Sequence, residues 1–336
     1  MKKWMVILFG LFLTVFGFFY TDIIEFEYPN HFPKPVYDFA KNKLTEKKVR
    51  LGRVLFYDPI LSLDGSISCA SCHSPYNAFA HTDHDLSHGI DDKIGIRNAP
   101  PLFNLAWQNS FMWDGAINHL DMQALAPITS PSEMGDSLLN VIMKLESSEK
   151  YRTLFNEAYG DSTITGQRLL LSLSQFQLTL VSGNSKYDKI KEGVDTFNIQ
   201  EKLGYDLFVV NCSSCHTEPL FTSGNFASNG LKLDSTLMDF GRGRVTRLKS
   251  DNLLFKIPSL RNLEYTNPYM HDGRFEKLRE VLNHYTDGVV NYGDAESSVR
   301  ITKRFSLTSN EKSDILAFLR TLNDQDFVFT KKHRER

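Results

Sequence analysis

Four cysteines and two histidines have the spacing with which proteins attach c-type haem. The cysteines form two C-x-x-C pairs, and a histidine directly follows each pair: Cys69, Cys72 and His73, then Cys212, Cys215 and His216. Two thiols at this spacing can add to the two vinyl groups on one edge of a porphyrin, and the adjacent imidazole then reaches the iron. The sequence therefore predicts two covalently bound c-type haems, each with its own histidine ligand.

Zinc binding and thiol redox chemistry are the alternatives for these cysteines. Two C-x-x-C pairs can build a four-cysteine zinc site, but Cys212 follows Cys72 only after 140 residues, which is unusual for a zinc ribbon. A thioredoxin-type motif needs a βαβ context, and strand signals are few in this chain. Covalent haem attachment is the better interpretation of both pairs.

An internal repeat indicates that each half of the chain carries one copy of the same module. The motif L-G-x-x-L-F starts at Leu51 and again at Leu203. The motif P-x-L-x-N-L, followed by M-W-D-G or M-H-D-G, starts at Pro100 and again at Pro258, an offset of 158 residues. Chance is a poor explanation for so many residues repeated at the same spacing. The repeat therefore predicts two related haem modules.

The repeat also allows the second axial position of the two irons to be compared. An apolar helical stripe from Leu278 ends at Tyr285, and the offset of 158 residues leads back to Pro127, which cannot ligate iron. If both positions face their haems, the first haem is open to peroxide and the second carries a phenolate ligand. Met270 and Met238 are rival ligands, and a core aromatic residue is the alternative role for Tyr285. A non-enzymatic electron carrier would need two capped irons, which Pro127 disfavours.

The elements that position these residues are expected to be mainly α-helical, with long ordered loops. Because such loops exceed what a compact domain normally tolerates, a large prosthetic group would help to organise them. A polar junction at 182–191 separates an N-terminal haem domain, 26–190, from a C-terminal haem domain, 191–330. Helical periodicity covers 43–56, 118–125, 137–145, 166–181, 199–210, 278–285 and 309–322.

Composition excludes several classes of protein. With 336 residues, 41% of them hydrophobic, and a net charge of -2, the chain is neither disordered nor a polytopic membrane protein. It also lacks the excess of positive charge that would attract nucleic acid.

The N-terminal segment indicates export. Lys2 and Lys3 precede 17 uncharged residues, so residues 1–25 are a signal peptide or an N-terminal anchor. The anchor is slightly favoured because no small-residue cleavage site follows, and a buried core helix is the weaker alternative. Export places the body in the periplasm, soluble or tethered to the inner membrane. Residues 22–35 read as a linker.

Several further motifs carry a resemblance to a known family. They are L-G-R-V-L-F-Y-D from Leu51, R-N-A-P-P from Arg97, F-M-W-D-G from Phe111, E-M at Glu133 and N-P-Y-M-H-D-G from Asn267, besides both C-x-x-C-H motifs. Over residues 40–325, the chain resembles the bacterial di-haem cytochrome c peroxidases and their MauG-type relatives. The resemblance implies two cytochrome c-like domains, a peroxidatic N-terminal haem and an electron-accepting C-terminal haem.

The resemblance also implies roles for individual residues. Trp113 is similar to the tryptophan between the two haems, Glu133 to the distal acid–base residue, and Gln123 to its companion. One carboxylate above an open iron can move a proton from the inner to the outer peroxide oxygen. Because Pro131 and Met134 bracket Glu133, we expect poor solvation and a raised pKa for its carboxyl group.

Calcium and a resting-state ligand are two more implications of the resemblance. Asn98, Thr266 and Pro268 match the family's calcium site between the domains, where main-chain carbonyls suit a hard cation. His88 lies about where some members place a histidine that caps the resting peroxidatic haem. A surface-loop histidine is an equal alternative, since His81 and His84 lie nearby.

The resemblance predicts a cytochrome-c peroxidase-type oxidoreductase that takes electrons from a small cytochrome c or similar donor. One departure favours a different branch. Typical peroxidases place methionine fourteen residues after the histidine of P-Y-x-H, whereas counting fourteen from His271 reaches Tyr285. An anionic oxygen ligand should lower the haem potential relative to methionine. The alternative is therefore a MauG-like oxidase that modifies a partner protein, and the family resemblance is compatible with a homodimer.

Overall fold

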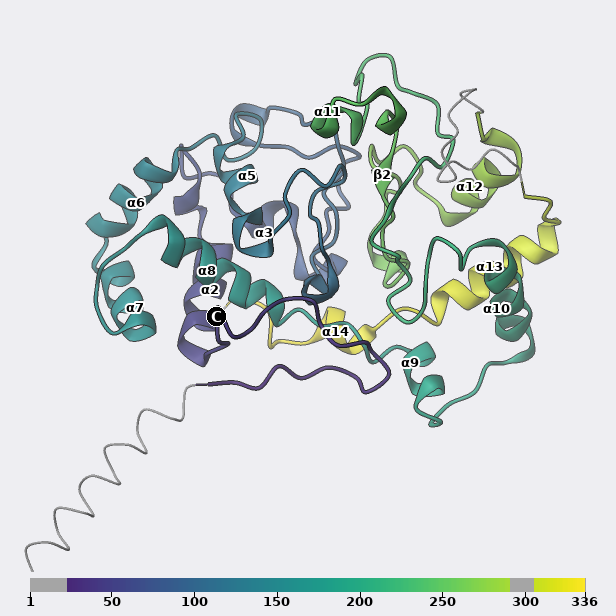
Figure 1. Cartoon of the computed structure of the whole chain (residues 1–336), viewed down its shortest axis with the longest axis horizontal. Helices are drawn as coiled ribbons and strands as arrows, with labels where there is room; N and C mark the ends of the chain where they lie inside the picture. Colours follow the sequence, from purple (N-terminus) through teal and green to yellow (C-terminus); the bar gives the residue numbers. More distant parts are fainter. Residues whose placement is uncertain (1–22, 291–304, 336) are drawn as a thin grey trace, which may run out of the picture.

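Two pairs of packed helices form the frame of the two halves. In the computed structural model, α2 (Glu46–Tyr57) packs on α8 (Gly166–Leu178), and α10 (Ile199–Asn211) packs on α13 (Ser309–Arg320) (Figure 1). Each contact needs a glycine. A Cβ atom on Gly52 would lie 1.9 Å from the carbonyl oxygen of Ser172, and one on Gly204 would lie 1.9 Å from that of Asp314. The repeated L-G-x-x-L-F motif therefore marks the point where the two helices of each pair meet most closely.

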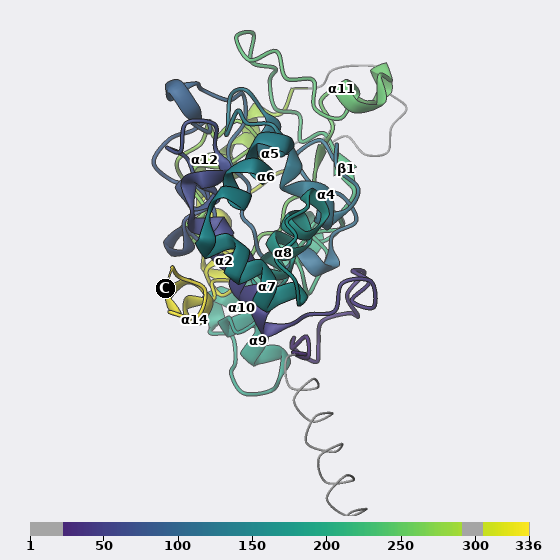
Figure 2. The ribbon, with the colours of Figure 1, turned by 90° about the vertical axis from the view of Figure 1, so that its left-hand side faces the viewer.

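The structure describes residues 23–290 and 305–335. The described part is mainly helical, as predicted, and long loops connect its helices. Within the N-terminal half the further helices are α3 (Cys69–Cys72), α4 (Leu120–Gln123), α5 (Leu125–Thr129), α6 (Leu138–Ser147) and α7 (Glu149–Tyr159). Figure 2 views the molecule from the side of this half, with α2, α7 and α8 in front.

Within its described residues, the second half has fewer long helices than the first and one small sheet. Strands β1 (Phe226–Ala227) and β2 (Phe255–Lys256) pair in antiparallel fashion, with Phe226 opposite Lys256. The remaining helices are α9 (Lys186–Lys191), α11 (Gly243–Thr246), α12 (Leu278–Asn283) and α14 (Gln325–Phe329). A five-residue π-helical turn, His284–Gly288, follows α12 and contains Tyr285.

The predicted helices exist, with shifted ends. Each frame helix begins at a side-chain cap, because Thr45, Thr165, Asn198 and Thr308 each accept a hydrogen bond from a backbone N–H three residues later. The expected helix 118–125 is instead two short helices, α4 and α5. Helix α7 was not predicted from the sequence.

The backbone repeats its geometry in the two halves. Met112 and Met270 both have left-handed φ angles, 67° and 77°, and Gly115 and Gly273 follow with 69° and 67°. Bridges join Phe111 to Ile117 and Tyr269 to Phe275 at the same offset of 158 residues. The predicted internal duplication is therefore confirmed at the level of individual turns.

Two hydrophobic clusters lie on either side of the junction. The first contains buried residues of α2, α6, α7 and α8, and the second contains Tyr187, Phe208, Phe221 and the buried face of α13. Helix α14 belongs to the first cluster through Phe327, so the end of the chain returns to the N-terminal half. The domain boundaries 26–190 and 191–330 remain a prediction. The packing of α14 shows that residues near 327 contact the N-terminal half, although the prediction assigns them to the C-terminal domain.

The segment that precedes α2 is not a free linker. Trp107 donates a hydrogen bond from Nε1 to the carbonyl oxygen of Pro33 at 2.7 Å, and its ring packs against Phe26, Tyr28 and Phe32. The linker interpretation of residues 22–35 is wrong over this stretch because its aromatic side chains bury large apolar surfaces against the body. The predicted signal peptide or anchor lies almost entirely outside the described residues. Within 23–290 and 305–335, no helix combines the length and apolar character needed to cross a bilayer.

Candidate active site

The first C-x-x-C-H motif presents its histidine with one ring nitrogen already bound. Cys69–Cys72 form the single turn α3, and His73 closes it by donating its backbone N–H to the carbonyl oxygen of Cys69 at 2.9 Å. The imidazole Nδ1 donates to the carbonyl oxygen of Phe79 at 2.9 Å. Burial lowers the pKa of His73 to about 4, so the ring is neutral. The lone pair of Nε2 is then available for iron, an arrangement typical of a haem-ligating histidine.

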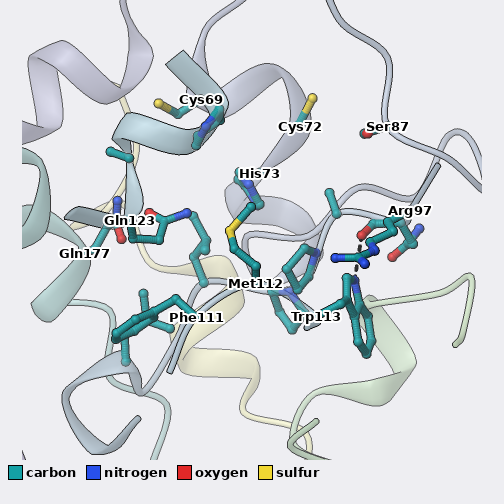
Figure 3. Close-up of a pocket in the computed structure, with 18 of the residues that line it drawn as sticks. Cys69, Cys72, His73, Ser87, Arg97, Phe111, Met112, Trp113, Gln123 and Gln177 are labelled. Atoms are coloured by element: carbon teal, nitrogen blue, oxygen red, sulfur yellow. Dashed lines mark hydrogen bonds between the residues drawn. The ribbon is translucent and has the colours of Figure 1, made fainter. Parts of the chain in front are cut away.

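Both thiols and this imidazole line one large cavity. The cavity contains about 1600 Å³ of space between atoms, its open mouth included. Figure 3 shows Cys69 and Cys72 on one short helix above His73. The two sulfur atoms, the free imidazole nitrogen and the mainly apolar residues around them, among them Phe56, Leu102 and Phe103, fit a covalently attached haem.

Glu133 lines the same cavity, together with Gln123 and Pro127. Its loop is fixed by a hydrogen bond from the backbone N–H of Ile90 to the carbonyl oxygen of Glu133, 2.8 Å long. Gly89 permits this contact, because a Cβ atom there would lie 2.4 Å from the same oxygen. Burial raises the pKa of the Glu133 carboxyl group, against a smaller lowering by a hydrogen bond from Ser130. The expected raised pKa is thus found, and the carboxyl group suits proton transfer.

Trp113 lies where the two halves meet. Its indole Nε1 donates to the carbonyl oxygen of Asn98 at 2.8 Å, and its own carbonyl oxygen accepts the backbone N–H of Lys256 at 2.7 Å. Residues of the second half, including Thr222 and Pro258, also line the cavity that contains Trp113. A short covalent and hydrogen-bonded connection therefore runs from Trp113 into the second half.

A salt-bridge network beside Trp113 joins the two halves. It was not predicted from the sequence. Arg97 binds both carboxylate oxygens of Asp239, at 2.6 and 2.8 Å, and also Asp114 at 2.7 Å. Figure 3 shows Arg97 and Trp113 close together in this view, with Gln123 and Gln177 farther across the cavity. Arg97 stood in a recognised motif, but nothing in the sequence indicated that Asp239 is its partner.

The second C-x-x-C-H motif has the same local design. Cys212 ends α10, and His216 donates its backbone N–H to the carbonyl oxygen of Cys212 at 2.9 Å. The imidazole Nδ1 lies 3.2 Å from the carbonyl oxygen of Phe221 and 3.1 Å from that of Pro258. Since Pro258 also lines the first cavity, the second histidine is one hydrogen bond away from the wall of the first site.

Tyr285 lies beside the second cysteine pair. Burial raises the pKa of its phenol, and the neighbouring thiols of Cys212 and Cys215 raise it further, against a hydrogen bond from the Asn229 side chain. The amide of Asn229 also donates to the Met270 sulfur at 3.2 Å, so this rival ligand lies near the same asparagine. Met238, the other rival, is 49% exposed. Asn229 carries no sequence signal and was not predicted.

The structure also places the residues of the calcium prediction. Asn98 is buried at the contact between the halves and donates its backbone N–H to the carbonyl oxygen of His271 at 2.8 Å. Thr266 is buried, and Pro268 follows a cis peptide bond. Calcium binding by Asn98, Thr266 and Pro268 stays a prediction.

His88 lines the first cavity and stacks on His84, with ring centroids 4.2 Å apart. Its role as a resting iron ligand also stays a prediction. In the described part of the chain, which includes all four cysteines, no group of three or more His, Cys, Asp or Glu side chains could hold a metal ion. The zinc alternative therefore gains no support.

Comparison with known proteins defines the class. Residues 46–196 match the family model described as "Di-haem cytochrome c peroxidase". The methylamine utilization protein MauG of Methylorubrum extorquens is 36% identical over 319 residues, which cover 91% of this chain and 85% of that protein. The cytochrome c551 peroxidase of Nitrosomonas europaea is 34% identical over 277 residues, 81% of this chain and 78% of that protein. The chain therefore belongs to the di-haem cytochrome c peroxidase and MauG family.

Solved structures agree with this assignment. A MauG-like protein associated with microbial copper homeostasis superimposes with a TM-score of 0.82 at 28% identity, covering 92% of this chain and 98% of that one. The diheme peroxidase BthA of Burkholderia thailandensis shares the fold, with a TM-score of 0.74 at 22% identity over 88% of this chain and 91% of that one. The protein is accordingly an oxidoreductase with two c-type haems.

Proposed function

We propose that the protein is a peroxide-dependent oxidoreductase whose N-terminal haem site reacts with hydrogen peroxide. The observation that carries this proposal is that the buried acid Glu133 shares one cavity with His73, Cys69 and Cys72. Pro127 lines the same cavity at the repeat position of Tyr285 and offers no ligand atom. When bound, the haem supplies the redox chemistry at the iron.

The side chains of the cavity supply proton transfer. Reduction of one hydrogen peroxide breaks the O–O bond, consumes two protons and two electrons, and releases two waters. Because its pKa is raised, Glu133 can take a proton from one peroxide oxygen and return it to the other, which then leaves as water. The amide of Gln123, also in the cavity wall, is suited to orient peroxide by hydrogen bonding.

Electrons reach the N-terminal site from the C-terminal site. Trp113, Lys256 and Pro258 form a continuous connection to His216, through the hydrogen bonds at 2.7 and 3.1 Å described above. Trp113 is the aromatic group in this connection, and it lies at the wall of the first cavity. We assign it the role of electron relay.

The electron source separates two candidate functions. A small cytochrome c or a similar donor would make the protein a cytochrome c peroxidase. Tyr285 favours the MauG-like alternative, because its phenol lies beside Cys212 and Cys215, where a phenolate ligand would lower the potential of the second haem. A low-potential haem accepts electrons from a cytochrome less readily. We therefore favour oxidation of residues on a partner protein.

Stopped-flow spectroscopy of the purified di-haem protein tests both candidates. The protein is mixed with hydrogen peroxide, with and without reduced cytochrome c. Rapid catalytic oxidation of the cytochrome would establish the peroxidase, whereas a long-lived oxidised species that barely oxidises it supports the MauG-like function. A protein that never reacts with peroxide contradicts the whole proposal.

The Tyr285→Met variant tests the ligand assignment separately. It should raise the potential of the C-terminal haem, leave that of the N-terminal haem unchanged, and speed oxidation of cytochrome c. Tyr265→Phe, which alters a tyrosine outside both haem sites, is the matched control. An unchanged C-terminal potential in Tyr285→Met would overturn the ligand assignment.

Periplasmic location is part of the proposal. It is supported by c-type haem attachment and by the apolar N-terminal stretch that suggests export.

A further inference from the structure

Lys256 places a buried ammonium group in the wall of the first cavity, although it belongs to the second half of the chain. It is the last residue of β2, and its backbone N–H is fixed by Trp113. Its Nζ donates hydrogen bonds to Oε1 of Gln108 at 2.5 Å and to the carbonyl oxygen of Ser110 at 2.9 Å. Strand pairing and two side-chain bonds therefore hold this charge at a fixed place between the halves.

This ammonium group lacks a negative partner within the described residues. Lys256 forms no ion pair within the described residues, whereas Arg97, which lines the same cavity, binds two carboxylates. Both oxygen atoms that accept from Lys256 are neutral. Burial lowers the pKa of its ammonium group to about 8, and no opposing charge raises it. Burying a cation is costly unless an anion compensates it.

The hydrogen-bonding capacity of Lys256 is also incomplete. An ammonium group has three N–H donors, and the protein accepts two of them. The same cavity contains Cys69, Cys72 and His73, which attach a macrocycle with two carboxylate side chains. The chain thus offers a buried cation with a spare donor in the cavity that receives a dianionic group.

We infer that Lys256 binds a propionate carboxylate of the N-terminal haem, so that a residue of the C-terminal half holds the cofactor of the N-terminal half. A fixed positive charge at this place favours the reduced state of the iron and raises its potential. Through its bond to Trp113, the same residue ties cofactor position to the connection between the two sites. The inference depends on haem attachment at Cys69 and Cys72 and not on the proposed peroxide reaction.

The Lys256→Met variant tests this inference in the purified di-haem protein without peroxide. Spectroelectrochemical titration that resolves the two haems should show a lower potential for the N-terminal haem and an unchanged potential for the C-terminal haem. The N-terminal potential should also become pH-dependent near neutrality, because the propionate has lost its cation. Lys256→Arg retains the charge and should restore most of the wild-type potential.

Gln108→Met is the matched control, because it removes one partner of Lys256 but leaves the charge. A purely structural clamp would make Gln108→Met and Lys256→Met behave alike, and that result would overturn the inference. So would an unchanged N-terminal potential in a folded Lys256→Met protein. If that variant fails to bind both haems, Lys256→Gln carries the same prediction, since it retains a polar donor without the charge.

A free anion is the other conceivable occupant of this position. Titrations after dialysis, with and without added phosphate, separate the two sources. A propionate partner predicts the same wild-type potential under both conditions. A wild-type N-terminal potential that changes with phosphate while that of Lys256→Met does not would assign the site to a free anion instead.

Discussion

The two halves share one helical frame but differ at the positions where chemistry is expected. Gly52 and Gly204 make the same close helix contact, and Met112 and Met270 repeat the same left-handed turn. Against this common frame, the N-terminal half has Pro127 in the wall of a large cavity, whereas the C-terminal half has a tyrosine beside its cysteine pair. The two halves thus share the helical frame and differ at the two positions that the repeat predicts to face the irons.

The halves also differ in the interactions made at one buried position of the repeat. At the repeat offset of 158 residues, Arg261 of the second half corresponds to Phe103 of the first. Arg261 is fully buried and forms two hydrogen bonds with Asp188, at 2.7 and 2.8 Å. Phe103 is also buried, and its ring lies 6.0 Å from that of Phe327. At this repeat position the second half therefore forms a buried ion pair with the junction 182–191, whereas the first half packs an aromatic ring near Phe327 of α14.

The largest expected effect tests whether Glu133 of the N-terminal half is required for the reaction with peroxide. Glu133→Gln keeps the shape of the side chain but removes its proton-accepting oxygen. Because general acid–base catalysis contributes roughly 10²–10⁴-fold, we expect the rate of reaction with peroxide to fall by about that factor. The measurement is stopped-flow absorbance of the haems after mixing with peroxide. Glu146→Gln, at an exposed glutamate, is the control, and an unimpaired Glu133→Gln protein would remove the assigned role.

The next prediction compares what the Arg261–Asp188 ion pair and the buried Phe103 side chain contribute to stability. Breaking a buried ion pair by neutralising one partner costs about 3–5 kcal/mol, and emptying a buried phenylalanine site costs about as much. We therefore expect Asp188→Asn and Phe103→Ala to lower the unfolding temperature by similar amounts in thermal melts. A stable Asp188→Asn protein would show that Arg261 is neutralised by another group.

Acid titration separates these two variants. Burial alone would raise the pKa of Asp188, but Arg261, with Ser185 and His31, lowers it to about 2, below its ordinary 3.8. The depressed pKa stabilises the fold above pH 3.8, and this contribution is lost as the pH falls toward 2. Phe103→Ala should retain this acid sensitivity, and Asp188→Asn should lack it. Equal acid sensitivity in both would contradict the ion-pair assignment.

The smallest effect tests the shared frame. Gly52→Ala and Gly204→Ala each place a methyl group against a backbone oxygen, and overpacking of this kind costs about 1–3 kcal/mol. Thermal melts should show comparable losses for both variants. Val210→Ala, at a position of α10 that is 81% exposed, should change stability by less than about 0.5 kcal/mol. If Gly52→Ala lowered the stability and Gly204→Ala did not, the two helix pairs would differ in how closely they pack.

Much of the site could be predicted because its residues are close in sequence. Cys69, Cys72 and His73 need only one helical turn to come together, and helical periodicity predicted the four frame helices. Helix α7 was missed although its buried residues, Tyr151, Leu154 and Phe155, have the helical spacing i, i+3 and i+4. The aromatic segment before α2 was misjudged because only the folded body supplies the surface on which Phe32 is buried and Phe26 partly buried.

By itself the sequence determined the cofactor, the duplication and the contrast between Pro127 and Tyr285, because attachment motifs and repeats are local or periodic patterns. Only the tertiary structure decided that Lys256 and Pro258 reach the cavity of the other half, and that Arg97 pairs with Asp239. These contacts join residues more than a hundred positions apart. Burial then changed the properties of these groups, because removal from water raises the pKa of the Glu133 carboxyl group and lowers that of the Lys256 ammonium group.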